Sequence, residues 1–310
     1  MKILITGVHG FVGRNLVPAL FADHTVYGLG RAVENVAGVE RMYTWEDLDR
    51  GMLPEVDAIV HLAGKAHDTK KQTGAEVYFA VNRDLTVKVY DYFRHSAARK
   101  FIFFSSVKAA ADFVKGTVLT EDVVPKPVGP YGESKIEAET YILNHPAEGK
   151  DVFILRPCMI HGPGNKGNLN LLYKVVCKGF PWPLGAFKNR RSFASVGNVC
   201  YLVCRLLEEH APSGIYNLAD DEAISTNELI SIICRVLGRK AHIFNISPSL
   251  MKKVAKVGDV LHLPLNTERI EKLTENYVVS NAKIKSVFGI EALPITVEDG
   301  LRETIESFNK

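Results

Sequence analysis

The sequence of 310 residues has no long apolar run, no basic run and no CxxC cysteine pair. No segment approaches the ~20 consecutive apolar residues of a membrane-spanning helix, so no membrane partner is expected. The formal net charge is only +3 and is not clustered, which argues against a nucleic-acid partner. Five scattered cysteines are typical of a reducing compartment, so we expect a cytoplasmic protein. Cys200 and Cys204 are interpreted as small core residues, and no metal site is expected.

The first half of the chain alternates short apolar segments with segments of helical periodicity. Strands are expected at Ile3–Thr6, Val26–Leu29, Asp57–Ala63, Phe101–Ser105 and Val152–Leu155, and helices at Phe11–Phe21, Val77–Ser96 and Tyr131–Asn144. Continuous apolar strands separated by helices indicate a parallel sheet covered on both faces. We therefore predict an α/β fold built on a Rossmann-type, doubly wound parallel sheet.

Turn-rich segments after Arg156 indicate a smaller, mostly helical C-terminal lobe that binds the substrate. Its helices are expected at Leu169–Lys178, at Leu229–Leu237 after a capping-box pattern, and from Thr296 to near Phe308. The predicted dinucleotide-binding domain comprises residues 1–160 with returning segments at about 189–221 and 276–291. The predicted substrate lobe comprises residues 161–188, 222–275 and 292–310.

A GxxGxxG motif stands between the first expected strand and the first expected helix. Glycines let the chain turn tightly and let a pyrophosphate approach the backbone, while the helix N-terminus offers free N–H groups. The motif therefore predicts a dinucleotide site. The contacts expected from this turn are Gly7, His9, Gly10, Phe11, Val12 and Gly13.

The second expected strand is followed by Arg31 and has no acid at its end. An acid there would bind the ribose of NAD, whereas a guanidinium can pair with the 2′-phosphate of NADP. The pattern favours NADP, and the alternative is NAD with Arg31 as a surface residue. The strand exit at Leu62, Ala63 and Gly64 is expected to pass close to the cofactor, and Asp47 to accept from its adenine amino group.

Three polar residues that could take part in catalysis follow the glycine turn along the sequence, in the order Ser106, Tyr131 and Lys135. Ser106 follows a strand end, where ligands sit in open α/β sheets. Tyr131 and Lys135 are four residues apart and share one helix face. An ammonium nearby is expected to lower the tyrosine pKa, which makes the phenol a usable general acid and base. YxxxK alone is more often just the start of an amphipathic helix, but with the glycine turn and Ser106 it indicates catalysis.

On these motifs the chain resembles the extended short-chain dehydrogenases/reductases of the NAD-dependent epimerase/dehydratase family, over essentially its whole length. The segments that carry the resemblance are Thr6–Gly13, His61–Gly64, Val81-Asn82, Ser105-Ser106, Tyr131–Lys135, Leu155–Pro157 and Arg191–Phe193. The resemblance implies a catalytic set of Ser106, Tyr131 and Lys135. It also implies Asn82 and Pro157 near the cofactor, and a homodimer formed through the two long helices of the first half.

Family members usually act on nucleotide-diphosphate sugars. The resemblance implies that Arg191 contacts the diphosphate, where a guanidinium binds phosphate oxygens bidentately. Asn168 follows a glycine loop and is expected either to bind phosphate or to cap its helix. Lys65, Ser106 and Leu184 are further expected substrate contacts.

Several positions depart from the family pattern. Pro157–Ile160 lacks the usual asparagine, Val107–Ala111 replaces Val-Tyr-Gly, and Asn276–Ser280 lacks the usual arginine. With these departures the chain resembles one branch of the family, which includes bacterial enzymes of surface-polysaccharide sugar synthesis. That branch contains UDP-4-keto-6-deoxy-N-acetylhexosamine reductases and UDP-hexose 4-epimerases. Dehydratases carry Asp-Glu where this chain has Val107-Lys108, which argues against dehydration.

The remaining alternatives share one chemistry at C4 of a UDP-hexose, with Tyr131 as general acid or base and hydride exchanged with nicotinamide. Arg31 favours a UDP-4-keto-(6-deoxy)hexose reductase using NADPH. A 4-epimerase of the UDP-glucose or UDP-N-acetylglucosamine type is the alternative. A non-catalytic dinucleotide sensor is the third, and it is disfavoured because Tyr131 and Lys135 are both intact.

Overall fold

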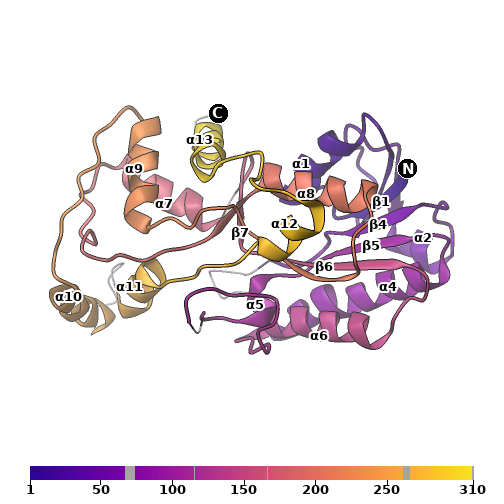
Figure 1. Cartoon of the computed structure of the whole chain (residues 1–310), viewed down its shortest axis with the longest axis horizontal. Coiled ribbons are helices and arrows are strands. Elements are labelled where there is room, and N and C mark those ends of the chain that lie inside the picture. Colours follow the sequence, from indigo (N-terminus) through magenta and orange to yellow (C-terminus); the bar gives the residue numbers. More distant parts are fainter. Residues whose placement is uncertain (67–73, 115, 166, 261–265, 309–310) are drawn as a thin grey trace.

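The computed structural model describes residues 1–66, 74–114, 116–165, 167–260 and 266–308. A seven-stranded sheet forms the middle layer of the half of the molecule that lies to the right in Figure 1. The strand order is β3-β2-β1-β4-β5-β6-β9, and all neighbouring strands are parallel. The strands are β1 (Lys2–Thr6), β2 (Thr25–Gly30), β3 (Arg41–Thr44), β4 (Ala58–His61), β5 (Lys100–Phe104), β6 (Asp151–Pro157) and β9 (Gly214–Leu218). The chain order reverses between β1 and β4, which confirms the predicted doubly wound sheet.

Helices cover both faces of this sheet (Figure 1). One face packs against α1 (Phe11–Leu20), α8 (Val196–Glu208) and α12 (Ala282–Phe288). The other face packs against α4 (Leu85–His95) and α6 (Pro130–Asn144). Successive strand residues point to opposite faces, so Ile3 and Ile5 lie in the first core and Leu4 in the second. Because both faces are buried, the strands need continuous apolar sequence.

The long helix expected at Val77–Ser96 is present but is not uniform. It consists of α3 (Ala75–Tyr78), a π-helical turn η1 (Phe79–Asp84) and α4. The π turn contains the fully buried Asn82, whose carbonyl accepts a hydrogen bond from Thr86 Oγ1 at 2.7 Å. Such π turns often occur at functional sites, and this one contains a residue expected near the cofactor.

The C-terminal region is helical, as predicted. Its helices are α7 (Asn168–Cys177), α9 (Thr226–Val236), α10 (Pro248–Val260), α11 (Thr267–Thr274) and α13 (Val297–Ser307). A two-stranded parallel sheet of β7 (Met159–His161) and β8 (Phe193–Ser195) joins this region to the rest. Ser225 caps α9 through a capping box and Thr296 caps α13. The division of the chain into two domains stays a prediction.

Within the described residues, no helix combines the length and the apolar character needed to cross a bilayer. Cys200 lies in the first core and Cys204 packs against it, as their interpretation as core residues predicted. Two short helices complete the description of the first half: α2 (Trp45–Asp49) and α5 (Val107–Ala110).

Candidate active site

Ser106 and Tyr131 are brought together by the junction of two helices. Ser106 follows β5 and is the N-cap of α5, where its hydroxyl accepts from Lys108 N at 3.2 Å. Tyr131 is in the first turn of α6 and is hydrogen-bonded to Ser106. A Cβ on Gly132 would lie only 2.5 Å from the carbonyl oxygen of Lys108. Glycine at this position therefore lets α6 approach α5 closely enough for the contact.

The Tyr131 phenol lies in a partly buried position, with its ring edge-on to Tyr78 at 6.2 Å between centroids. Burial raises the pKa of Tyr131, and the hydrogen bond with Ser106 opposes this only in part. The direction is opposite to the lowering that the sequence predicted. A phenol with a raised pKa is protonated at neutral pH and can act as a proton donor.

Lys135 lies one turn along the same helix and is 5% exposed. Its Nζ donates to the carbonyl oxygen of Phe104 at 2.7 Å and lies 4.9 Å from the centroid of the Phe103 ring. Burial lowers the pKa of Lys135 to about 8, and the nearby Glu139 carboxylate opposes the shift. The ammonium is thus held by the end of β5, and burial of the phenol, not Lys135, dominates the pKa of Tyr131.

The lowered pKa of Lys135 predicts a pH-dependent stability. The unfolded chain, with a lysine pKa near 10.5, binds more protons than the folded chain between about pH 8 and 10.5. The free energy of unfolding should therefore rise with pH through this window, by up to roughly 3 kcal/mol from this group. Urea unfolding of wild type and Lys135→Met across the window measures the difference, with the exposed Lys88→Met as the control. Parallel pH profiles for wild type and Lys135→Met would contradict the assignment.

Asn82 fixes the chain where it leaves β4. Its Oδ1 accepts from Lys65 N at 2.7 Å, and its Nδ2 donates to Lys65 O at 3.1 Å and to Ser134 Oγ at 3.1 Å. A Cβ on Gly64 would lie 3.0 Å from Asn82 Oδ1 and 3.2 Å from Lys135 Nζ. The strand exit, the π turn and α6 are therefore packed directly around Lys135.

A buried hydrogen-bond chain that the sequence did not reveal connects β1 and β4 to this helix. Ala63 N donates to Thr6 Oγ1 at 3.0 Å, and Thr6 Oγ1 donates to His61 Nδ1 at 2.8 Å. His61 Nε2 donates to Thr86 Oγ1 at 3.0 Å, since the Thr86 hydroxyl itself donates to the Asn82 carbonyl. Burial lowers the pKa of His61 to about 3, so the ring is neutral and holds one fixed tautomer.

A buried ion pair lies one helical turn beyond Lys135. Arg156 of β6 and Glu139 of α6 are 1% and 0% exposed. The Arg156 Nη2 to Glu139 Oε2 distance is 2.5 Å, and Ser105 Oγ also donates to this carboxylate. The signals for this pair were a charged residue inside an apolar strand and a glutamate four residues after Lys135. The pair ties the ends of β5 and β6 to the catalytic helix.

The glycine turn is shaped for a dinucleotide. Gly7 has a φ of +75°, and a Cβ there would lie 2.9 Å from Ala63 N. A Cβ on Gly13 would lie 2.6 Å from the Gly7 carbonyl oxygen. Among the described residues, no acceptor is found for the N–H groups of Phe11 and Val12 at the start of α1. These N–H groups and the close backbone approach fit a pyrophosphate.

The other expected cofactor residues surround this turn. Arg31 is exposed directly after β2, and His9 Nε2 lies 3.2 Å from the Glu34 carbonyl oxygen. The Asp47 carboxylate accepts from Thr44 N at 2.7 Å and closes a capping box on α2, and these bonds lower its pKa. Its contact with adenine stays a prediction. Pro157 is buried at the end of β6.

The expected substrate residues lie in the C-terminal region. Arg191 donates to the Lys272 carbonyl oxygen, and its Nη2 lies 3.5 Å from Glu275 Oε1. Leu184 is 2% exposed and packs against α10. Asn168 is the first residue of α7, and its side chain lies outside the described part of the structure. The N-cap is Gly167, whose N–H is bound by Asn165 Oδ1 at 2.6 Å, so the expected capping by Asn168 is wrong.

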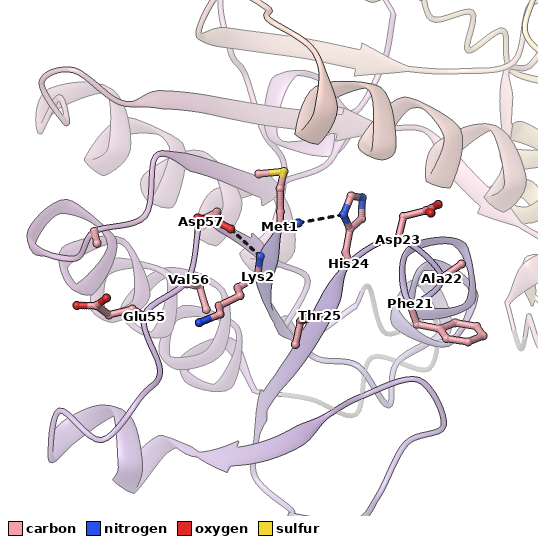
Figure 2. Close-up of a pocket in the computed structure, with 11 residues that line it drawn as sticks. Met1, Lys2, Phe21, Ala22, Asp23, His24, Thr25, Glu55, Val56 and Asp57 are labelled. Atoms are coloured by element: carbon pink, nitrogen blue, oxygen red, sulfur yellow. Dashed lines mark hydrogen bonds between the residues drawn. The ribbon is translucent and has the colours of Figure 1, made fainter.

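A hollow of about 630 Å³ opens at the opposite, amino end of β1 and β2 (Figure 2). Lys2, His24, Glu55 and Asp57 are among its lining residues, and Lys2 N donates to Asp57 Oδ2 at 2.6 Å. The glycine turn and the catalytic residues are at the carboxyl ends of the strands. The hollow is therefore separate from the candidate active site.

A family model described as the NAD dependent epimerase/dehydratase family matches residues 3–219. The chain belongs to this family. It is similar to the UDP-glucose 4-epimerase of Vibrio cholerae, at 28% identity over 99% of this chain and 95% of the relative. It is also similar to the N-acetyl-alpha-D-glucosaminyl-diphospho-ditrans,octacis-undecaprenol 4-epimerase of Escherichia coli O157:H7, at 26% identity over 98% and 94% of the two chains.

Two solved structures show the same fold. MoeE5 in complex with UDP-glucuronic acid and NAD has a TM-score of 0.76 and 21% identity, and covers 100% of this chain and 99% of its own. RMD from Pseudomonas aeruginosa complexed with NADPH has a TM-score of 0.72 and 21% identity, with 99% and 98% covered. These two likenesses show a shared fold, and the family match makes the chain a member of an NAD-dependent enzyme family.

Proposed function

We propose that the protein is an NADPH-dependent reductase acting at C4 of a UDP-4-keto-6-deoxyhexose. The single observation that carries the preference is Arg31, exposed directly after β2 at a position where no acid is present to bind a ribose 2′-OH. A guanidinium there can pair with the 2′-phosphate of NADP. The raised pKa of Tyr131 agrees with this preference, because a reductase needs a protonated phenol at the start of its reaction.

When bound, the reduced nicotinamide supplies a hydride to C4 of the sugar. Tyr131 donates its proton to the oxygen that develops negative charge, and Ser106 donates a hydrogen bond to the same oxygen. Lys135, held at Phe104 O, stabilises the phenolate that remains. Asn82 keeps the β4 exit and the catalytic helix in register throughout.

The diphosphate of the substrate is proposed to bind Arg191. Its present partners are the Lys272 carbonyl and the Glu275 carboxylate, so the guanidinium is already held in the C-terminal region. A bidentate diphosphate would replace the 3.5 Å contact with Glu275. Lys65, Asn168 and Leu184 are proposed to complete this part of the site.

A 4-epimerase is the second candidate, supported by the Vibrio cholerae relative, which matches 99% of this chain. The same residues would serve, but Tyr131 would first remove the C4 hydroxyl proton. A homodimer through α4 and α6 is also proposed. Next to them, Arg83 of η1 and Glu137 of α6 form a partly exposed ion pair, with 2.9 Å between Arg83 Nη1 and Glu137 Oε2.

The test is to denature the purified protein and identify any dinucleotide that it releases. The proposal expects a site that is empty or exchangeable and that titrates with NADPH at higher affinity than with NADH. Arg31→Glu should reverse this preference, and Arg14→Glu, in the adjacent α1, serves as a charge-matched control. Tightly retained NAD in the wild type would overturn the reductase preference and favour the epimerase.

A further inference from the structure

Helix α10 exposes an apolar stripe to solvent. Leu250, Val254 and Val257 are 52%, 44% and 54% exposed. Their spacing of four and three residues places them on one face of the helix. Three large aliphatic side chains in a row on a free helix face are costly in water, which indicates a surface that something covers.

The stripe is not needed for the core of the lobe. The adjacent side of α10, about 100° round the helix from the stripe, is already packed through Met251 and Ala255, which are 3% and 1% exposed. These residues form a cluster with Leu184 and Ile270. The helix is therefore fixed to the lobe by one face and presents the other outward, at the end of the molecule remote from the main sheet (Figure 1).

Positive charge accompanies the stripe. Lys252, Lys253 and Lys256 of α10 are exposed, and within the described residues no ion pair is found for any of them. The single acid of α10 is Asp259, whose carboxylate accepts from the hydroxyl of Thr267 at 2.5 Å and from its N–H at 2.9 Å. The outward side of α10 thus combines apolar and cationic side chains.

We propose that this face of α10, formed by Leu250, Val254 and Val257 with the three lysines, docks on an anionic phospholipid surface. A helix with an apolar stripe on one face and lysines on its remaining exposed side, of which Lys253 lies nearest the stripe, lies in the plane of a bilayer interface with its apolar side chains at the acyl boundary. Lysines strengthen such binding by attraction to anionic head groups. The sequence predicted no membrane partner because no run is long enough to span, but a peripheral helix of 13 residues needs no such run.

Vesicle co-sedimentation of the full-length protein tests the proposal, with phosphatidylcholine vesicles that contain or lack phosphatidylglycerol. Wild type should bind the anionic vesicles and release them at high salt. Leu250→Ser/Val254→Ser/Val257→Ser should lose at least tenfold in apparent affinity, since the buried apolar area is removed. Lys252→Gln/Lys253→Gln/Lys256→Gln should lose affinity by about fivefold for each lysine near the surface.

The matched control is Val124→Ser/Val128→Ser, which removes two aliphatic side chains that are 84% and 64% exposed elsewhere. It should bind vesicles as wild type does, and all variants should keep wild-type melting temperatures and cofactor affinity. Equal binding of wild type and stripe variant, or no preference for anionic vesicles, would overturn the proposal. So would a change of oligomeric state in the stripe variant without vesicles, which would assign the face to a second copy of the chain.

Discussion

Tyr131→Phe should lower turnover by roughly 10²- to 10⁴-fold while leaving dinucleotide affinity almost unchanged. The substitution removes only the hydroxyl that is hydrogen-bonded to Ser106, and the ring keeps its edge-on contact with Tyr78. Without that hydroxyl the proposed general acid for the C4 oxygen is missing, and the Ser106 hydroxyl is left only as a hydrogen-bond donor. Steady-state kinetics on UDP-4-keto and UDP-hexose substrates, together with a fluorescence titration of the cofactor, measure both quantities.

Tyr141→Phe is the matched control on the same helix. Tyr141 OH donates to the Asp91 carboxylate at 2.9 Å, remote from the chemistry, so this variant should retain wild-type turnover. Wild-type turnover in Tyr131→Phe would remove the catalytic role of the tyrosine. Loss of turnover in both variants would indicate a general effect on α6 instead.

Arg156→Met should lower the free energy of unfolding by roughly 3–5 kcal/mol, the largest stability effect that we expect from one substitution. It leaves the Glu139 carboxylate, which is 0% exposed, without its hydrogen-bonded ion-pair partner, and among the described residues Ser105 is the one hydrogen-bond donor that remains to it. Urea unfolding followed by circular dichroism measures the change.

The double variant Arg156→Met/Glu139→Leu separates charge from packing. Replacing both partners of a buried pair by apolar residues is often neutral, so the double variant should recover most of the loss. The exposed ion pair of Arg83 and Glu137 gives a second comparison. Arg83→Met should lower the free energy of unfolding by less than about 1 kcal/mol. If Arg156→Met is no more destabilising than Arg83→Met, or if the double variant is as unstable as the single one, the pair does not hold the site together.

The sheet could be predicted because its strands are buried on both faces. A short continuous apolar run such as that of β5 is typical of a strand buried on both faces. The glycine turn marks the junction between β1 and α1. The predicted helix at Tyr131–Asn144 differs from α6 by a single residue, Pro130. Local patterns thus determined the elements and the order of the catalytic residues along them.

Contacts between distant segments could not be predicted in this way. The hydrogen-bond chain from Thr6 through His61 to Thr86 joins residues up to 80 positions apart in the sequence. No local sequence pattern predicts which hydroxyl groups will bind a buried histidine. The direction of the Tyr131 pKa was missed for the same reason. The sequence places Lys135 on the face of Tyr131, but only the fold directs its ammonium to the carbonyl of Phe104.

The substrate side was the least predictable part, because its residues serve the fold as well. Leu184 is a core residue under α10. The same holds on the cofactor side for Asp47, the expected adenine contact, whose carboxylate closes a helix cap. Arg191 is held by Lys272 and Glu275 from α11 and its end. A sequence motif cannot separate such structural contacts from ligand contacts.

The most direct test of the central claim is to follow deuterium from the nicotinamide to the sugar. The enzyme is incubated with a UDP-4-keto-6-deoxyhexose and NADPH that carries deuterium at the transferable position, and the product is analysed by mass spectrometry and NMR. The account predicts one deuterium, bound at C4 of the sugar, and formation of the labelled product roughly 10²- to 10⁴-fold more slowly with Tyr131→Phe. Product without deuterium, or with deuterium at another carbon, would contradict hydride transfer at C4.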